Sequence, residues 1–176
     1  GVGFVTGATM ANFTGLAAAR HVLLQREGWD VEKQGLFGAP PITVIVGDKV
    51  HVSVLKALSL LGLGRDRVRR VPTDAQGRMR PELLPRAKGP TIICAQVGHV
   101  ATGACDPIAQ ICTGAHEADA WVHVDGAFGM WAAAAPKRAH LVHGLPEADS
   151  WATDAHKWLN VPYDSGLVFV REEQHL

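Results

Sequence analysis

The sequence predicts an α/β protein: a three-layer α/β/α sandwich built around a mostly parallel sheet. Runs such as Ile42–Val46 and Thr91–Val97 consist largely of β-branched and other apolar residues, which is typical of strands covered on both faces. Segments of helical length separate these runs, and strands that alternate with helices favour parallel pairing. Each expected element follows from a local pattern of this kind.

The first expected element is a strand that ends at Phe4–Thr6. Small residues from Gly7 onward open a helix that runs to about Arg26, with Gly28 as the stop signal. Free backbone amides and the helix dipole make such a helix start a favourable anion site. An ordinary N-cap is the competing interpretation. No GxxxxGK[ST] motif is present, so a nucleoside triphosphate loop is not indicated.

The strand Ile42–Val46 leads through a turn into a second helix, which carries His51 at its start and ends near Gly62–Gly64. His51 therefore follows the carboxyl end of a buried strand. Ligands of open α/β sheets bind at the carboxyl ends of the strands. This position makes His51 a candidate binding residue.

The middle of the chain is expected to form a short strand at Val68–Val71, a short helix at Arg80–Ala87 and the buried strand Thr91–Val97. The loop that follows this strand contains His99 and Thr102. Both side chains lie on the carboxyl side of the strand and are candidates for ligand contact.

The next expected helix opens at Asp106 and Pro107 and extends to about Ala118. Aspartate is a favourable N-cap residue, and proline is tolerated in the first turn of a helix. We therefore expect the Asp106 side chain to cap this helix.

The strand Trp121–Asp125 is apolar except for His123 and its terminal aspartate. Side chains two positions apart share a strand face, so His123, Asp125 and, if the strand continues, Ala127 point the same way. An aspartate that closes an apolar strand is a candidate site residue. A carboxylate that caps the following turn is the alternative.

A helical piece at Pro136–His143, a short strand at Ala148–Thr153 and a last strand at Gly166–Val170 complete the expected fold. No internal repeat or low-complexity segment is present. The strands that end at 46, 125 and 153 place His51, Asp125 and Lys157 at one edge of the sheet, together with the helix start after Gly7.

Lys157 stands between His156 and Trp158, with no acidic residue four positions away to pair with it. A lysine amine in apolar surroundings is a usable nucleophile, best known for forming a Schiff base with a carbonyl cofactor or substrate. A snorkelling lysine with its head group in water is the alternative.

These features together match what pyridoxal 5'-phosphate (PLP) requires. Its phosphate needs amides and hydroxyls, its ring needs a flat group against it, and its aldehyde needs a lysine. Its ring nitrogen needs a carboxylate, because a nearby anion raises the pKa of that nitrogen, and the protonated ring drains charge from a substrate carbanion. The sequence therefore indicates PLP as the cofactor.

Five segments carry a resemblance to a known family. They are TGATMAN from Thr6, HVSVLKA from His51, GHVATGACDPI from Gly98, WVHVDGAFG from Trp121 and DSWATDAHKWLNVPYDSG from Asp149. Across almost its whole length the chain resembles the group II PLP-dependent decarboxylases, which include the aromatic amino acid, histidine and glutamate decarboxylases. The resemblance implies the large PLP-binding domain of fold type I, similar to that of aspartate aminotransferase.

The resemblance also implies a role for each matching residue. Lys157 would form the internal Schiff base, and Asp125 would pair with the pyridine nitrogen. His51 would stack on the ring, and Ala127 would pack on its other face. The phosphate would be bound by the turn Gly7, Ala8 and Thr9 and approached by His156.

The chain departs from the family pattern at three places. Gly98-His99-Val100 stands where many relatives have Gly-Thr-Thr or Gly-Asn-Val, so contacts to the cofactor hydroxyl or substrate carboxylate from this loop differ. Asp154 stands where several relatives carry asparagine, which changes the charge near the phosphate. The turn from Gly7 has fewer side-chain donors than is usual.

Composition argues against several kinds of binding partner. Seventeen basic and seventeen acidic residues cancel, so no overall field favours nucleic acid or an anionic membrane. No apolar run approaches the roughly 18 to 20 residues that cross a bilayer. The nine histidines are scattered and no metal site is expected. The three cysteines form no CxxC pair and are interpreted as reduced thiols of a cytoplasmic protein.

The expected activity is decarboxylation of a small-molecule L-amino acid. Another reaction of the same cofactor class, by an aminotransferase, carbon–sulfur lyase or aldehyde-lyase, stays open, because substrate contacts outside these motifs choose the bond that breaks. A truncated, catalytically silent domain is the second alternative. We expect residues 1–176 to be a single incomplete PLP-binding domain, without the N-terminal segment and C-terminal small domain of the family, and the full-length protein to be a homodimer.

Overall fold

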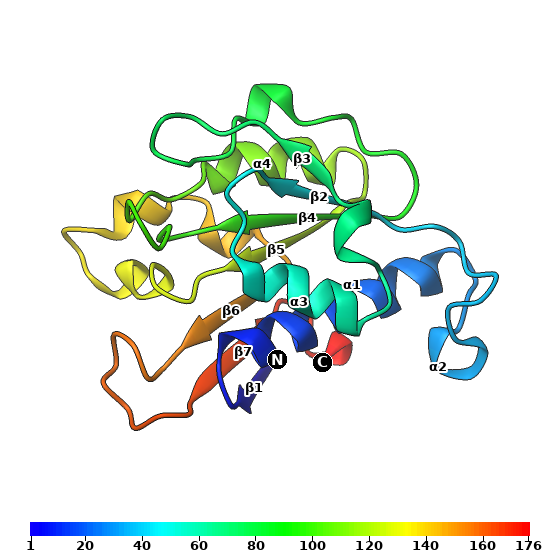
Figure 1. Ribbon diagram of the computed structural model, residues 1–176, viewed down its shortest axis with the longest axis horizontal. Coiled ribbons are helices and arrows are strands. Elements are labelled where there is room, and N and C mark those ends of the chain that lie inside the picture. Colours follow the sequence, from blue (N-terminus) through cyan, green and yellow to red (C-terminus); the bar gives the residue numbers. More distant parts are fainter.

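The computed structural model describes residues 1–176 and contains one seven-stranded sheet in the order β1-β7-β6-β5-β4-β2-β3 (Figure 1). Strands β2 to β6 run parallel, whereas β7 pairs antiparallel with both β6 and β1. The predicted mostly parallel sheet is confirmed. The strands are β1 (Val2–Val5), β2 (Thr43–Gly47), β3 (Arg69–Val71), β4 (Thr91–Gln96), β5 (Trp121–Asp125), β6 (Ser150–Asp154) and β7 (Gly166–Val170).

Helices cover both faces of this sheet. Alternate residues of β4 show the division: Ile92 and Cys94 belong to a core shared with α1 (Ala8–Arg26) and α3 (Val52–Leu60), whereas Ile93 packs against α4 (Ile108–His116) on the other face. A one-turn helix, α2 (Val31–Gln34), follows α1. The predicted three-layer α/β/α arrangement is therefore confirmed (Figure 1).

The long helix α1 is able to lie close to the sheet because its inward residues are small. Ala11 and Ala19 are completely buried, and Leu16 supplies the bulk between them. Burying a leucine side chain contributes roughly 1.5 to 3 kcal/mol, before the entropy of ordering it is counted. This close packing brings the start of α1 to the carboxyl ends of β5 and β6.

Two expected α-helices are not formed. The segment predicted as a helix at Arg80–Ala87 forms only a 3-10 turn at Pro81–Leu83, and the one at Pro136–His143 forms only a 3-10 turn at Ala139–Val142. Pro85 lacks the amide that would continue the first of these helices. Both predictions of α-helix were wrong.

Asp106 does not cap α4. The helix begins at Ile108, and no side chain caps it. The Asp106 carboxylate instead accepts hydrogen bonds from the amides of Met79 and Gln96, both at 2.7 Å. Backbone donors from distant segments have replaced the expected local ones.

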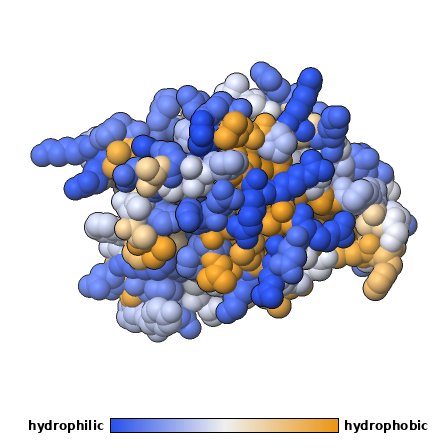
Figure 2. Space-filling view, turned by 45° about the horizontal axis from the view of Figure 1, so that its top comes forward, coloured by the Kyte–Doolittle hydropathy of each residue, from blue (hydrophilic) through white to orange (hydrophobic).

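Several large apolar side chains are exposed on the surface. Figure 2 shows one face, on which hydrophobic residues come to the surface between hydrophilic ones. The most exposed large apolar side chains include Phe4, Phe37, Trp158 and Tyr163. All three cysteines are free, and none of the helices has both the length and the apolar character needed to cross a membrane.

Candidate active site

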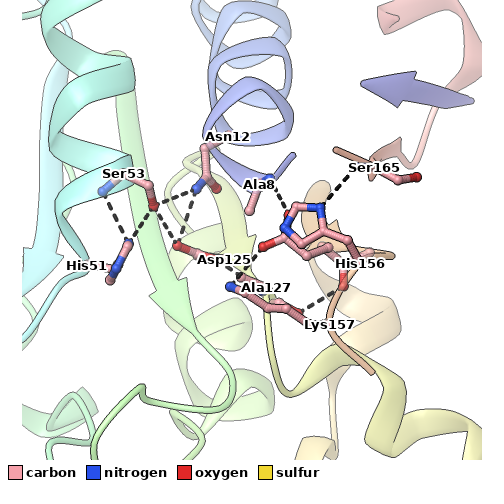
Figure 3. Close-up of polar contacts among 12 residues, drawn as sticks. Ala8, Asn12, His51, Ser53, Asp125, Ala127, His156, Lys157 and Ser165 are labelled. Carbon is pink, nitrogen blue, oxygen red and sulfur yellow. Dashed lines mark hydrogen bonds and ion pairs between the residues drawn. The ribbon is translucent and has the colours of Figure 1, made fainter. Parts of the chain in front are cut away.

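The candidate site lies where the carboxyl ends of β5 and β6 meet the starts of α1 and α3. Figure 3 shows side chains from these four segments directed toward one another. Helix starts at this edge present backbone amides, and the strand ends present side chains, as in other open α/β sheets. The edge therefore gathers residues that are far apart in the sequence.

Asp125, the last residue of β5, is the buried charge at the centre of this edge. Its carboxylate accepts hydrogen bonds from Asn12 Nδ2 at 3.2 Å, Ser53 Oγ at 3.3 Å and the Ala127 amide at 3.1 Å. Burial raises the pKa of Asp125, and the Ala127 amide, Asn12 and the charges of His51 and Lys157 act in the opposite direction. The donors thus stabilise the ionised carboxylate against its desolvation.

His51 is the N-cap residue of α3. Its Nδ1 atom lies 2.8 Å from Ser53 Oγ and 3.2 Å from the Ser53 amide nitrogen, so the ring is held beside the helix start. A narrow cavity is lined by His51, Asp125 and Ala127 together with Gln96. The imidazole, the carboxylate and the small side chain expected around the cofactor ring therefore share one cavity.

The sequence suggested that Lys157 has no acidic partner, and the structure contradicts this. Its Nζ atom lies 2.8 Å from Asp154 Oδ2, three residues earlier, and 4.2 Å above the ring centre of Phe128. Asp154 is buried, and its other oxygen accepts a hydrogen bond from the Ala8 amide at 2.6 Å. A carboxylate at the start of α1 thus holds the lysine amine near that helix.

His156 and Gly7 complete this part of the edge. His156 Nδ1 accepts from the Ser165 amide at 2.9 Å, and its Nε2 lies 3.4 Å from Asp154 Oδ1. Gly7 has a φ of +155°, and a Cβ there would lie 3.3 Å from the His156 ring and 3.4 Å from Asp154. The turn at residues 7–9 and His156 are therefore neighbours.

His99 and Thr102 lie apart from this group. The Thr102 hydroxyl donates to the Gln76 carbonyl at 2.7 Å, and the His99 ring packs 3.4 Å from where a Gly77 Cβ would stand. His99 lines a second cavity of about 500 Å³, which adjoins the first one through Gly98 and Phe128. Neither of the two loop candidates contacts Asp125 or Lys157.

Several contributors were not predicted as site residues. Asn12 and Ser53 both bind Asp125, and Gln96 lines the same cavity with its Oε1 atom buried and without a partner. Asn12 lies one helical turn after Ala8, and Ser53 lies two residues after His51, so both occur within motifs already singled out. The short sequence distances from Asn12 to Ala8 and from Ser53 to His51 could have identified them as site residues.

The residues around this edge have the chemistry that PLP needs, although Lys157 is not among those that line the narrow cavity. A flat heterocycle with a protonated ring nitrogen would supply a donor to Asp125, and Gln96, whose buried Oε1 has no partner, lines the same cavity. The Lys157 amine lies at the start of α1, where the backbone amides favour an anion. No group of three histidine, cysteine, aspartate or glutamate side chains is placed to hold a metal ion. The fold and this site define a PLP-binding α/β protein.

Comparison with known proteins supports this class and narrows it. Residues 1–176 match the family described as the pyridoxal-dependent decarboxylase conserved domain, and the chain belongs to that family. The resemblance stated from the sequence is confirmed, and so is the expectation of a pyridoxal cofactor, which the family name contains.

Individual relatives agree with the family assignment. The chain is 34% identical to an aromatic-L-amino-acid decarboxylase of Bacillus atrophaeus, over 98% of this chain and 35% of the relative. The crystal structure of mouse CSAD superposes with a TM-score of 0.89 at 31% identity, covering 98% of this chain and 38% of that one. Oryza sativa TDC with PLP and tryptamine gives a TM-score of 0.83 at 29% identity, covering 99% and 37%. The chain thus spans about a third of the length of its relatives.

Proposed function

We propose that this protein binds PLP and catalyses the decarboxylation of an L-amino acid. The observation that carries the proposal is the buried Asp125, which is held by three donors in a cavity that it shares with His51 and Ala127. The charge of Lys157 acts on this carboxylate. Membership in the decarboxylase family supports the choice of reaction.

Each residue would have a distinct task. PLP, when bound, supplies a ring that accepts electrons from a bond broken at the substrate α-carbon. Asp125 would hold a proton on the ring nitrogen, which requires the carboxylate to be ionised. Lys157 would hold the cofactor covalently through its amine, while His51 and Ala127 would bound the faces of the ring.

The start of α1 would hold the phosphate. We assign this role to the backbone of Gly7, Ala8 and Thr9, with His156 beside it, because helix starts favour anions. The Ala8 amide, which donates to Asp154 Oδ1 in this structure, would turn to the phosphate. Asp154 would orient the Lys157 amine, to which it is 2.8 Å away. His99 would act through the adjoining cavity, which it lines, and Thr102 would act by holding this loop through its hydrogen bond to the Gln76 carbonyl.

An absorbance titration tests the cofactor proposal. PLP added to the purified protein should produce a new band at the edge of the visible range, and the Lys157→Ala variant should lack it because no other amine occupies this position. The exposed Lys137 provides a matched control, and Lys137→Ala should keep the band. A band of equal strength in both variants would show that another amine carries the cofactor.

Product analysis tests the reaction. With a panel of L-amino acids, decarboxylation releases carbon dioxide and leaves an amine, whereas an aminotransferase releases a keto acid. Carbon–sulfur lyase and aldehyde-lyase reactions give other fragments. Keto acid without carbon dioxide would remove the carboxy-lyase assignment while leaving the cofactor site in place.

We also propose that the full-length protein works in the cytoplasm as a homodimer. Support comes from the exposed apolar run after Lys157, in which Trp158 is 70% and Tyr163 82% accessible, and from the three free cysteines. Light scattering on the purified protein tests the dimer. A mass of one chain at micromolar concentration, with and without PLP, would contradict it.

A further inference from the structure

A chain of buried polar side chains runs from the middle of the sheet to Asp125. Trp121 Nε1 lies 2.9 Å from Ser150 Oγ, which lies 2.8 Å from His123 Nδ1. His123 Nε2 lies 2.8 Å from Asn12 Oδ1, and Asn12 Nδ2 lies 3.2 Å from Asp125 Oδ2. Figure 3 shows the Asn12 end of this chain. None of these side chains except Asp125 belongs to the proposed cofactor contacts.

The chemistry of the two ends fixes the direction of every hydrogen bond. Trp121 only donates, so Ser150 Oγ accepts from it and is free to donate its own proton to His123 Nδ1. An ionised Asp125 only accepts, so Asn12 presents its Nδ2 to the carboxylate and its Oδ1 to His123. His123 Nε2 must then carry the proton. Every donor points toward Asp125.

The ring of His123 has only one proton to place. His123 is fully buried, and burial lowers its pKa to about 3, so the ring is neutral at physiological pH. With Nδ1 accepting from Ser150, that proton sits on Nε2. The neutral Nε2–H tautomer is the one that Asn12 needs.

We propose that His123 is a positioning residue, whose neutral Nε2–H tautomer locks the Asn12 amide with its nitrogen toward Asp125 and so keeps that carboxylate ionised. The inference rests on the proposed function in one respect, namely that Asp125 serves the cofactor ring. A reversed Asn12 amide would turn its oxygen toward the carboxylate, replacing a donor by a repulsive contact.

Asp125 depends on such donors because it is buried. The titratable groups that face it are His51 at the start of α3, Lys157 after β6 and Cys94 on β4, with His123 acting through Asn12. His51 and Lys157 favour the ionised form of Asp125. Asn12 is a donor that also favours this form and has no charge of its own, so its orientation depends on its neighbours: Ser53 Oγ lies 3.2 Å from Nδ2, and His123 Nε2 lies 2.8 Å from Oδ1.

Helix α1 leaves room for this arrangement. Gly15 lies over the His123 ring, and a Cβ at this position would stand 2.8 Å from Cε1 and 3.0 Å from Nδ1. Any larger residue would push the ring away from Ser150 and Asn12. Gly15 is therefore needed for the position of the His123 ring.

Nuclear magnetic resonance on the 176-residue protein without cofactor tests the proposal directly. With ¹⁵N-labelled histidine, the His123 ring should be neutral between pH 5 and pH 8, because this range lies roughly two or more pH units above its lowered pKa. The ring proton should be on Nε2. A proton on Nδ1, or a charged ring at neutral pH, overturns the proposal. Failure of PLP to bind would contradict the proposed function and leave this result unaffected.

Variants test the effect on Asp125. With ¹³C-labelled aspartate carboxyls, His123→Phe should move the titration of Asp125 to higher pH, and His123→Gln, whose amide still donates toward Asn12, should move it back toward the wild type. The exposed His140 is the matched control, and His140→Phe should change nothing. A folded His123→Phe variant with an unchanged Asp125 titration overturns the proposal. If that variant does not fold, the tautomer measured in the wild type decides.

Discussion

Asp106 is the residue whose carboxylate ties together two distant backbone segments. Replacing it with alanine leaves the Met79 and Gln96 amides without their acceptor, and each unsatisfied buried group costs about 1 to 3 kcal/mol. We expect Asp106→Ala to lose about 2 to 4 kcal/mol of unfolding free energy by urea denaturation. In hydrogen exchange, the Met79 and Gln96 amides should lose protection while those of α4 keep theirs. Loss confined to α4 would restore the N-cap interpretation, and Asp66→Ala at an exposed site is the control.

The same variant carries a pH signature. Burial raises the pKa of Asp106 to about 6, against about 3.9 for an unfolded aspartate. Between these values the folded protein binds a proton that the unfolded chain does not, so the contribution of Asp106 to stability is full below about pH 4 and is lost as the pH rises through 6. Asp106→Ala should lack this part of the slope. Parallel stability curves for the two proteins between pH 4 and pH 7 would contradict the raised pKa.

At the scale of elements, α1 and α4 each contain an interior glycine with a different environment. Alanine is normally about 1 kcal/mol better than glycine in a helix. At the exposed Gly114 of α4 an added Cβ meets nothing within 4 Å, whereas at Gly15 of α1 it meets the His123 ring at 2.8 Å. We expect Gly114→Ala to stabilise by about 0.5 to 1 kcal/mol and Gly15→Ala to destabilise by about 1 to 3 kcal/mol. Equal gains in the two urea midpoints would mean that α1 does not press on β5 as described.

At the scale of the whole molecule, the two ends of the chain meet. The Gly1 ammonium donates to the Val170 carbonyl at 2.7 Å, and a Cβ on Gly1 would lie 3.2 Å from Leu176 (Figure 1). A short glycine- and serine-rich linker from Leu176 to Gly1 should therefore be tolerated, with new ends opened in the exposed stretch between Lys88 and Gly89. The permuted protein should keep the circular dichroism and cooperative unfolding of the original.

A second permutant serves as the contrast. Opening the chain between Gly126 and Ala127 would break a packed turn, where the Ala127 amide binds Asp125 and a Cβ on Gly126 would lie 2.7 Å from Met130. This permutant should fail to fold cooperatively. If both permutants unfold with the same cooperativity, exposure of the cut does not determine whether a permutant folds.

Some of this protein was determined by local sequence alone. The β-branched run of β2, the apolar run of β5 that ends in Asp125, and the helix start after Gly7 are patterns of a few adjacent residues, and the backbone follows them because propensity and burial agree there. The motif around Lys157 likewise sufficed for the family, which the comparisons confirmed. The roles of the individual site residues stay predictions.

The tertiary structure alone decided how polar groups were paired. Asp154 accepts from the Ala8 amide, Asp106 accepts amides from two other segments, and Asn12 joins His123 to Asp125 across more than a hundred residues. The antiparallel placement of β7 between β6 and β1 belongs here too. Apolar patterning specifies which face of an element is buried. A buried donor or acceptor must find a partner wherever the assembled fold brings one, and that partner is set by distance in space and not along the chain.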